Sequence, residues 1–380
     1  MLDFQLDNRQ QEIIEKYRDF SNRWIVPNRM KYDELATFPW DIVHAAYDEK
    51  IINASLPREY GGQDFSIFDG ALSSEELGYG CTGIGICIDA STLALTPLLL
   101  TGSDEQKKRI FGEIIEKKGV AAYALTEPNA GSDVQGIKTT AIKHGDKYIV
   151  NGHKRFITNG EVAEYITVFA LVDPERGSRS LSAFAIQKDT PGITMASRLE
   201  KMGQRASVQN EIIFENVEVP ATNLLGGEGY GFLIAMKTFD RTRTGVAAAA
   251  VGNARSAYDY SREWAKNRIQ FGHPVTALQG VSFMLSDMAT EIEAARMLVW
   301  RAAWAYDTQQ KDFSKLSAMS KYYATDVAMK VTTDAVQVMG GEGYSREHPV
   351  EKMMRDAKLS QIYEGTNQVN RLVVSKHILK

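Results

Sequence analysis

One glutamate near the C-terminus has neighbours that suit it to act as a base. Glu364 lies in Ile362-Tyr363-Glu364-Gly365-Thr366, between apolar residues and a glycine that lets the backbone turn. Apolar neighbours exclude water, which raises the pKa of a carboxylate and helps it to accept a proton near neutral pH. The local sequence alone favours a plainer interpretation, a solvated glutamate in a turn between two helices, so other parts of the chain must decide.

Four other segments carry groups that suit a planar or phosphate-bearing ligand: residues 123–133, 155–160, 268–272 and 337–344. The first is dense in hydroxyls and free backbone N–H groups, and the second places an aromatic ring and a hydroxyl on one strand face. The third offers a cation, an amide and an aromatic ring, and the glycines of the fourth permit close approach. Each segment alone is equally explained as a domain-joining turn, a hairpin, a capped helix end or a helix stop. Together, in this order, they favour a ligand site.

The chain that must position these segments changes its pattern twice. Residues 1–120 and 229–380 carry apolar residues at helical spacing, whereas residues 121–228 hold short β-branched and aromatic runs separated by Gly, Asn, Asp or Pro. We therefore predict an α+β multi-domain fold, with an N-terminal α-helical domain (1–120), a middle antiparallel β-barrel or sandwich domain (121–228) and a C-terminal four-helix bundle (229–380). Strands and helices do not alternate, which argues against a Rossmann sheet.

The same patterns predict individual elements. Gly78 and Gly80 are expected to end a helix, residues 83–100 form a second, buried helix, and Ser103 with Gln106 makes a capping box for a third. The predicted strands are residues 139–143, 148–151, 155–158, 165–172, 182–187, 193–196 and 211–219. The predicted C-terminal helices are residues 247–266, 278–307, 315–339 and 368–380.

Composition argues against several classes of protein. The 380 residues carry a net charge of −4 with dispersed Lys and Arg, so neither nucleic acid nor an anionic membrane is an expected partner. Cys81 and Cys87, the two cysteines, are too few for a disulfide framework, and the six histidines lack metal-binding spacing, so no metal is expected. A basic, apolar leader and a run of about 18 apolar residues are both absent, which predicts a cytoplasmic protein without membrane insertion.

Taken together, the segments resemble the acyl-CoA dehydrogenase family of FAD flavoenzymes, with the medium- and short-chain branch the most similar. The resemblance rests on Tyr-Ala-Leu-Thr-Glu-Pro-Asn-Ala-Gly-Ser-Asp, Phe-Ile-Thr-Asn-Gly, Arg-x-x-Phe-Gly, Gln-Val-Met-Gly-Gly and Ile-Tyr-Glu-Gly-Thr, and it runs the full length. It implies FAD-dependent α,β-dehydrogenation of an acyl-CoA thioester to the 2-enoyl-CoA. Glu364 would remove the α-proton, and the β-hydrogen would leave as a hydride to flavin N5.

By position in these motifs, the resemblance assigns residues to the FAD. Those expected at the isoalloxazine are Tyr123, Leu125, Thr126, Phe156 and Thr158, with Ser132 facing both flavin and CoA. Those expected at the pyrophosphate and adenine are Arg268, Phe271 and Gln279, with Gln337, Gly340 and Gly341 supplied by a neighbouring subunit. Thr366 and Gln368 would reach the FAD beyond the base.

The resemblance also assigns the substrate side. Ser132 and Gly365 would line the thioester site, and Asp240 and Arg243 would contact CoA or position the loop of the base. The Glu364 N–H and a flavin ribityl hydroxyl would hold the thioester oxygen, which makes the α C–H acidic. Some branches place the base at the position of Thr242, and because a threonine stands there, Glu364 is the expected base.

One acid in the expected acyl pocket allows two interpretations. Asp89 interrupts the apolar residues 83–100. The favoured interpretation is a carboxylate at the pocket floor, hydrogen-bonded to Ser91, Thr92 or water. The alternative is that Asp89 contacts a ring or a remote polar group, since related enzymes acting on cyclic acyl-CoAs use a second carboxylate from this region. A dehydrogenase of a cyclic acyl-CoA is therefore the alternative function.

The resemblance implies an electron-transferring flavoprotein as the electron acceptor, and a homotetramer built as a dimer of dimers. An acyl-CoA oxidase and an enoyl-CoA reductase are alternatives of the same class, although the chain is short for a peroxisomal oxidase and Ile378-Leu379-Lys380 is no peroxisomal signal. A flavin-bound, acyl-CoA-binding scaffold without activity is the alternative of another class. The presence of Glu364 together with every flavin segment argues against a scaffold.

Overall fold

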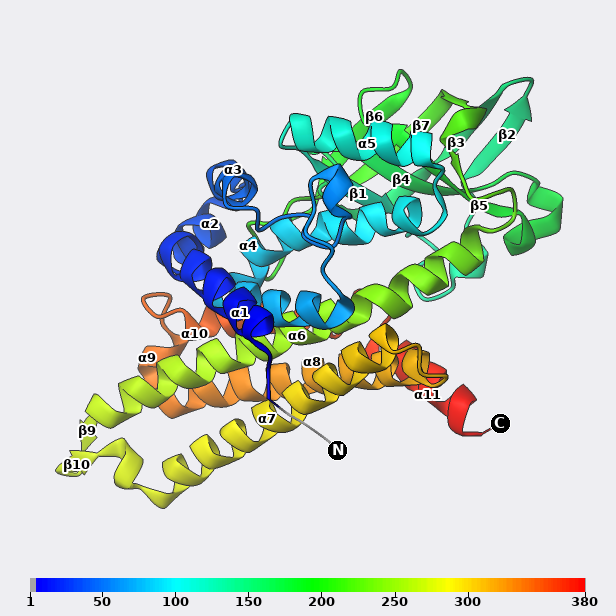
Figure 1. The fold of residues 1–380 in the computed structure, drawn as a ribbon. Coiled ribbons are helices and arrows are strands. Elements are labelled where there is room, and N and C mark those ends of the chain that lie inside the picture. The colour runs from blue at the N-terminus through cyan, green and yellow to red at the C-terminus, as the bar shows by residue number, and fades with distance from the viewer. Residues whose placement is uncertain (1–4, 380) are drawn as a thin grey trace.

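The computed structural model describes residues 5–379, which form a helical, a β and a second helical block in the predicted order (Figure 1). Ser103 and Gln106 form the predicted capping box at the start of the last helix of the first block. The helices of this block are α1 (Asn8–Phe20), α2 (Arg29–Leu35), α3 (Trp40–Asp48), α4 (Ile67–Thr101) and α5 (Asp104–Glu116).

The long helix α4 consists of two helical segments, which confirms the predicted break near Gly78 and Gly80. The first segment ends beside Gly80 and the second follows a kink at Cys81, where φ is −175° and ψ is 120°. Gly78 serves a close contact, because a Cβ there would lie 2.3 Å from Ala249 O of α6 (Gly231–Asn267). The two helices therefore pack backbone to backbone at this point, which holds α4 against the bundle.

Counted across the kink, α4 runs for 35 residues and is strongly apolar. Within residues 5–379 it is the one helix whose length and hydropathy reach those of a membrane-spanning helix. Of its most apolar window, 61% is buried inside the protein, and the core helix of a soluble protein has the same composition. Its contacts with α1, α6 and β1 (Val120–Ala124) account for that burial.

Within the described residues the middle block is one sheet of eight strands in the order β6-β7-β3-β2-β4-β5-β8, with β1 paired to β4 outside this path. Neighbouring strands are antiparallel as predicted, except that β1 pairs with β4 in parallel and β2 meets β4 at one parallel bridge. A long connection follows β1, which frees it from the antiparallel order that short hairpins impose. The other strands are β2 (Thr140–His144), β3 (Lys147–Thr158), β4 (Ala163–Leu171), β5 (Leu181–Gln187), β6 (Ile193–Arg198), β7 (Gln209–Pro220) and β8 (Leu224–Leu225).

The third block is a bundle of long helices. Its first helix, α6, begins at Gly231, next to the predicted start of the helical block at residue 229, and runs through the predicted helix 247–266 to Asn267. A short hairpin of β9 (Ile269–Gln270) and β10 (His273–Pro274) joins α6 to α7. The remaining helices are α7 (Gln279–Asp307), α8 (Phe313–Met339), α9 (Gly341–Tyr344), α10 (Val350–Ser360) and α11 (Asn367–Ile378).

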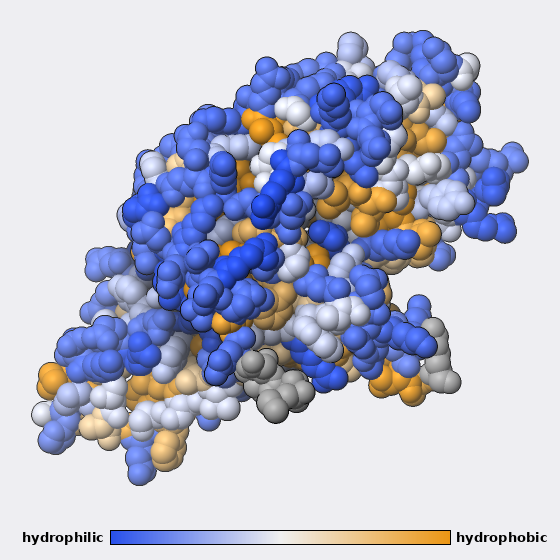
Figure 2. All heavy atoms as spheres, in the orientation of Figure 1, coloured by the Kyte–Doolittle hydropathy of each residue, from blue (hydrophilic) through white to orange (hydrophobic). Residues whose placement is uncertain are grey.

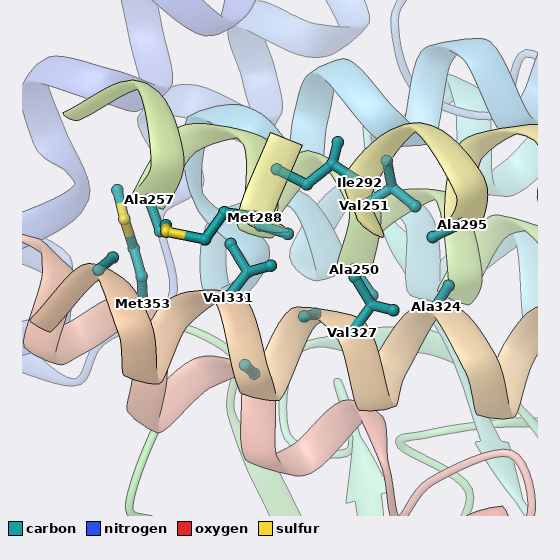
Figure 3. Packing of buried hydrophobic residues seen from close by; sticks show 14 of the residues in the cluster. Ala250, Val251, Ala257, Met288, Ile292, Ala295, Ala324, Val327, Val331 and Met353 are labelled. Atoms are coloured by element: carbon teal, nitrogen blue, oxygen red, sulfur yellow. The ribbon is translucent and has the colours of Figure 1, made fainter. Parts of the chain in front are cut away.

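The bundle core combines large apolar side chains with many alanines. Figure 3 shows Met288 and Ile292 of α7 packed between Val251 of α6 and Val331 of α8, all of them buried. The small side chains of buried alanines such as Ala295 and Ala324 let the helices approach closely. Helices α10 and α11, which flank the loop that carries Glu364, pack against α8 of this bundle.

Candidate active site

A cavity of about 860 Å³ lies where α4, the sheet and the bundle meet. Its walls come from α4, β1, β3, α6 and the segment between α10 and α11, residues 361–366, which we call the base loop. Two of the carboxylates singled out in the sequence, Glu364 and Asp89, line it. The fold thus brings the expected base and the acid of the expected acyl pocket into one chamber.

The base loop holds Glu364 in a left-handed backbone conformation. Glu364 has φ 51° and Gly365 has φ 87°, values that are uncommon for residues other than glycine. Thr366 caps α11, as predicted, by accepting a hydrogen bond from Val369 N–H at 3.2 Å. Two successive left-handed residues turn the chain sharply between the helices, and this turn presents Glu364 to the cavity.

The half-buried Glu364 side chain meets a hydroxyl and lies near two cations. Thr242 Oγ1 donates to Glu364 Oε2 at 2.7 Å, and Arg243 Nε donates to the Glu364 carbonyl oxygen at 3.3 Å. Burial raises the pKa of Glu364, while the Thr242 hydrogen bond and the charges of Arg243 and Lys321 oppose the rise. Among residues 5–379 the Glu364 N–H finds no acceptor, so it is available to a ligand.

Replacing Thr242 with valine is expected to move the acid limb of activity to higher pH. The Thr242 hydroxyl stabilises the ionised Glu364, so its loss raises the pKa of the carboxyl and protonates the base at higher pH. A hydrogen bond to a charged group contributes ~1.5 kcal/mol, which corresponds to a shift of about one unit. The measurement is the rate of substrate-driven FAD reduction against pH. Thr242→Ser, which keeps the hydroxyl, should retain the wild-type profile, and an unshifted Thr242→Val profile would contradict this role.

Asp89 lies half-buried on the α4 wall of the cavity. Ser74 Oγ donates to Asp89 Oδ2 at 2.7 Å, so the partner of this carboxylate is Ser74 and not Ser91 or Thr92, which corrects the sequence-based interpretation. Fifteen residues of straight helix would separate these two side chains by ~22 Å, so the kink at Cys81 folds the halves of α4 together. Burial raises the pKa of Asp89 to about 6, against the opposing Ser74 hydrogen bond.

The residues predicted at the isoalloxazine line the same cavity: Tyr123, Leu125, Thr126, Ser132, Phe156 and Thr158. The Tyr123 hydroxyl is buried without a hydrogen-bond partner in the described part of the chain. Phe156 has φ 60° and leaves half of its ring exposed. An unpaired buried hydroxyl and an exposed ring on one wall fit a planar ligand with polar edges, such as a flavin.

The other residues predicted at the cofactor do not line this cavity. Arg268, Phe271, Gln279, Gln337, Gly340 and Gly341 are all exposed, around the β9–β10 hairpin, the start of α7 and the end of α8. Figure 1 places this hairpin at the end of the bundle opposite α11. The Phe271 ring is 87% exposed, and Figure 2 shows hydrophobic residues at this end of the surface. One chain therefore presents two separated parts of the predicted cofactor site.

Two further predicted contacts also fall outside the cavity wall. Gln368 is exposed on the first turn of α11, and Asp240 lies behind the wall on α6. Asp240 accepts hydrogen bonds from Arg243 Nη1 at 3.1 Å and from Ser314 Oγ at 3.0 Å. It therefore orients the Arg243 guanidinium, which does line the cavity together with Gly365 and Thr366.

Three residues that act on Glu364 or Asp89 have no such role in the sequence prediction: Thr242, Lys321 and Ser74. Thr242 is treated there only as the position of an alternative base, and neither Lys321 nor Ser74 is singled out. Lys321 had a detectable signal, because it falls on the apolar face of α8 where a charged residue is unexpected. Ser74 had none, because its contact depends on the kink in α4.

Family models for the acyl-CoA dehydrogenase N-terminal, middle and C-terminal domains match residues 7–118, 122–217 and 229–379. This chain belongs to the acyl-CoA dehydrogenase family. It is therefore a flavoprotein oxidoreductase that acts on acyl-CoA, and FAD is the cofactor of the family. The helix–β–helix architecture is that of the family, which confirms the predicted fold class.

Relatives of known name align with this chain over nearly its full length. Cyclohex-1-ene-1-carbonyl-CoA dehydrogenase of Geobacter metallireducens is 44% identical, over 98% of this chain and 99% of the relative. The structure of butyryl-CoA dehydrogenase from Megasphaera elsdenii aligns over 100% of both chains with 40% identity and a TM-score of 0.96. A chain in the structure reported for the electron transferring flavoprotein of Acidaminococcus fermentans also aligns over 100% of both chains, with 42% identity and a TM-score of 0.97.

Proposed function

We propose that this acyl-CoA dehydrogenase oxidises thioesters whose acyl group is a six-membered carbon ring. The observation that carries the proposal is the presence of Glu364 and Asp89, both with raised pKa, on the walls of one cavity. A straight acyl chain would gain nothing from a second carboxylate in its pocket, and burying one is unfavourable. The 44% identical relative named for a cyclohexene thioester supports the same substrate class.

In this proposal Glu364 takes the α-proton of a thioester that is saturated at its α-carbon. The free Glu364 N–H donates to the thioester oxygen and so acidifies the α C–H. Exclusion of water by the bound thioester raises the proton affinity of the carboxylate further. FAD, when bound, accepts the β-hydrogen with its two electrons, and the product is the 2-enoyl thioester.

Asp89 takes a ring proton when the α-carbon already belongs to a double bond. Such a thioester has no α-proton. Its acidic C–H belongs to the ring carbon that follows the far end of the double bond, and loss of this proton leaves an anion that is delocalised onto the thioester carbonyl. With a pKa of about 6, Asp89 is largely ionised at neutral pH and can accept this proton. The ring carbon on the other side of the α-carbon then loses a hydride, for which FAD, when bound, would be the acceptor. One proton and one hydride are lost, and the product is a conjugated ring diene.

The proposal also includes an electron acceptor and a homo-oligomeric assembly. An electron-transferring flavoprotein is the proposed acceptor, supported by the 42% identical chain in the Acidaminococcus fermentans structure. A homotetramer, as a dimer of dimers, would let a second copy bring Gln337, Gly340 and Gly341 to the FAD, and their exposure far from the cavity supports this. A cytoplasmic location and domain limits at residues 1–120, 121–228 and 229–380 complete the proposal.

The test is anaerobic mixing of the holoenzyme with four thioesters while the flavin absorbance is followed. Cyclohexanecarbonyl-CoA and cyclohex-1-ene-1-carbonyl-CoA are expected to bleach the flavin faster than butyryl-CoA or octanoyl-CoA. Bleaching by the linear thioesters alone would contradict the ring assignment. No bleaching by any of them would favour a binding scaffold, and fast reoxidation in air would favour an oxidase.

A further inference from the structure

A buried cation lies directly behind the base loop. Lys321 belongs to α8 and stands on the face that carries Ala324, Ala328 and Val331, in the bundle core. Its side chain is 0% exposed. An ammonium group in such surroundings is strongly destabilising unless it has hydrogen-bond partners, so the partners of Lys321 reveal what it supports.

Those partners are the base loop and the first residue of α11. Lys321 Nζ donates to the Gly365 carbonyl oxygen at 2.8 Å and to Asn367 Oδ1 at 3.1 Å. The Gly365 carbonyl accepts a second hydrogen bond from Asn370 Nδ2 at 2.8 Å. Asn367 Nδ2 donates back to Thr325 Oγ1 of α8 at 2.9 Å. Helix α8 therefore holds the chain immediately after Glu364.

The two successive carbonyls of the loop both face cations. Arg243 of α6 binds the Glu364 carbonyl at 3.3 Å, and Lys321 of α8 binds the Gly365 carbonyl at 2.8 Å. A left-handed conformation at a residue other than glycine costs free energy and persists only where surrounding contacts impose it. The two cations, one from each helix, supply such contacts for Glu364.

Lys321 also acts on the carboxylate through its charge. Burial lowers the pKa of Lys321 to about 7, with attraction to Glu364 and Asp326 opposing this and Arg243 adding to it. The ammonium is therefore mostly protonated below about pH 7, where a glutamate titrates. The other titratable groups around Lys321 and Glu364 are Arg243 and Asp240 of α6, Tyr123 of β1 and Tyr363 of the base loop.

We propose that Lys321 is a positioning residue for the base: it holds the base loop in its left-handed turn, and its positive charge stabilises the ionised form of Glu364. This inference rests on the proposed role of Glu364. It adds to that role a requirement for α8, which contributes no residue to the cavity wall.

The test replaces Lys321 with methionine, which keeps much of the length and loses the charge and the donors. Loss of the charge raises the pKa of Glu364, so the acid limb of FAD reduction by cyclohexanecarbonyl-CoA should move to higher pH by ~0.5–1 unit. That is less than the ~1–3 units produced by a cation in direct contact with a carboxylate. The second readout is hydrogen exchange, in which the amides of residues 363–367 should exchange faster in the FAD-bound variant.

Matched variants separate charge from geometry. Lys321→Arg keeps the positive charge and should leave the acid limb near its wild-type position. Lys321→Gln loses the charge but keeps an amide donor; it replaces the methionine variant if that protein does not fold, and should show the same shift of the acid limb. Lys330→Met removes an exposed cation elsewhere on α8, one that pairs with Glu291, and should change neither readout.

The outcomes are distinct from those that bear on Glu364 itself. If Glu364→Gln abolishes FAD reduction but neither uncharged Lys321 variant shifts the acid limb or the exchange of residues 363–367, this inference is overturned and the role of Glu364 stands. If Glu364→Gln still reduces FAD, the proposed function fails first. A shifted acid limb with faster loop exchange, restored by arginine, supports the positioning role.

Discussion

Glu364→Gln is expected to abolish reduction of FAD by cyclohexanecarbonyl-CoA while FAD stays bound. Glutamine has the size of glutamate, can still accept the Thr242 hydrogen bond and leaves the backbone N–H unchanged, but its amide cannot take the α-proton. Loss of a positioned general base lowers the rate by at least ~10²–10⁴-fold. The measurement is anaerobic stopped-flow absorbance, with the FAD content read from the spectrum of the purified variant.

A surface variant and a stability measurement keep this result interpretable. Glu12→Gln changes an exposed glutamate of α1 away from the cavity and should reduce FAD at the wild-type rate. Thermal unfolding of Glu364→Gln should stay close to that of the wild type, since glutamine keeps the size of the side chain and accepts the Thr242 hydrogen bond. Bound FAD with undiminished reduction would mean that the base is another residue.

Asp89→Asn is expected to abolish FAD reduction by cyclohex-1-ene-1-carbonyl-CoA and to leave that by cyclohexanecarbonyl-CoA largely intact. Asparagine accepts the same Ser74 hydrogen bond, so the pocket keeps its shape, but the amide takes no proton from a ring carbon. The loss with the unsaturated ring should reach at least ~10²-fold, as for removal of another general base. The saturated ring relies on Glu364, so the same stopped-flow measurement with both thioesters gives an internal comparison.

Ser74→Ala is the control that keeps the acid and removes its partner. The Ser74 hydrogen bond holds the pKa of Asp89 down, so its loss should raise that pKa above about 6 and move the acid limb with the unsaturated ring to higher pH without abolishing the reaction. An Asp89→Asn variant with an unchanged substrate profile would end the ring proposal. A straight-chain substrate served by Glu364 alone would then be the better assignment.

Much of the fold followed from patterns that act over a few residues. Helical and strand periodicities predicted the order of the three blocks, and the Ser103 capping box and the Thr366 cap lie where expected. These features depend on contacts within one or two turns, which the residue types determine directly. The same holds for the turn that carries Glu364, because a glycine follows it and a capping threonine comes next.

The predictions that erred depend on contacts between distant segments: β1 pairs with β4 in parallel, and the partner of Asp89 is Ser74. Gly78 and Gly80 stand just before the break of α4 at Cys81, as predicted, but only the structure shows that Gly78 also allows the close contact of α4 with α6. Helix α6 begins close to the predicted helical start at residue 229, and its apolar pattern is interrupted before residue 247 by polar residues of the site such as Asp240 and Arg243. Polar residues that a site requires weaken the periodicity that predicts the element carrying them.

The sequence by itself determined the architecture, the family and the identity of the expected base. Only the tertiary structure decided which groups act on the two carboxylates. Ser74 reaches Asp89 because α4 folds back at Cys81, and Lys321 reaches the base loop because α8 packs beneath it. The physical reason is that a pKa responds to groups a few ångströms away in space, and these come from segments far apart in the chain.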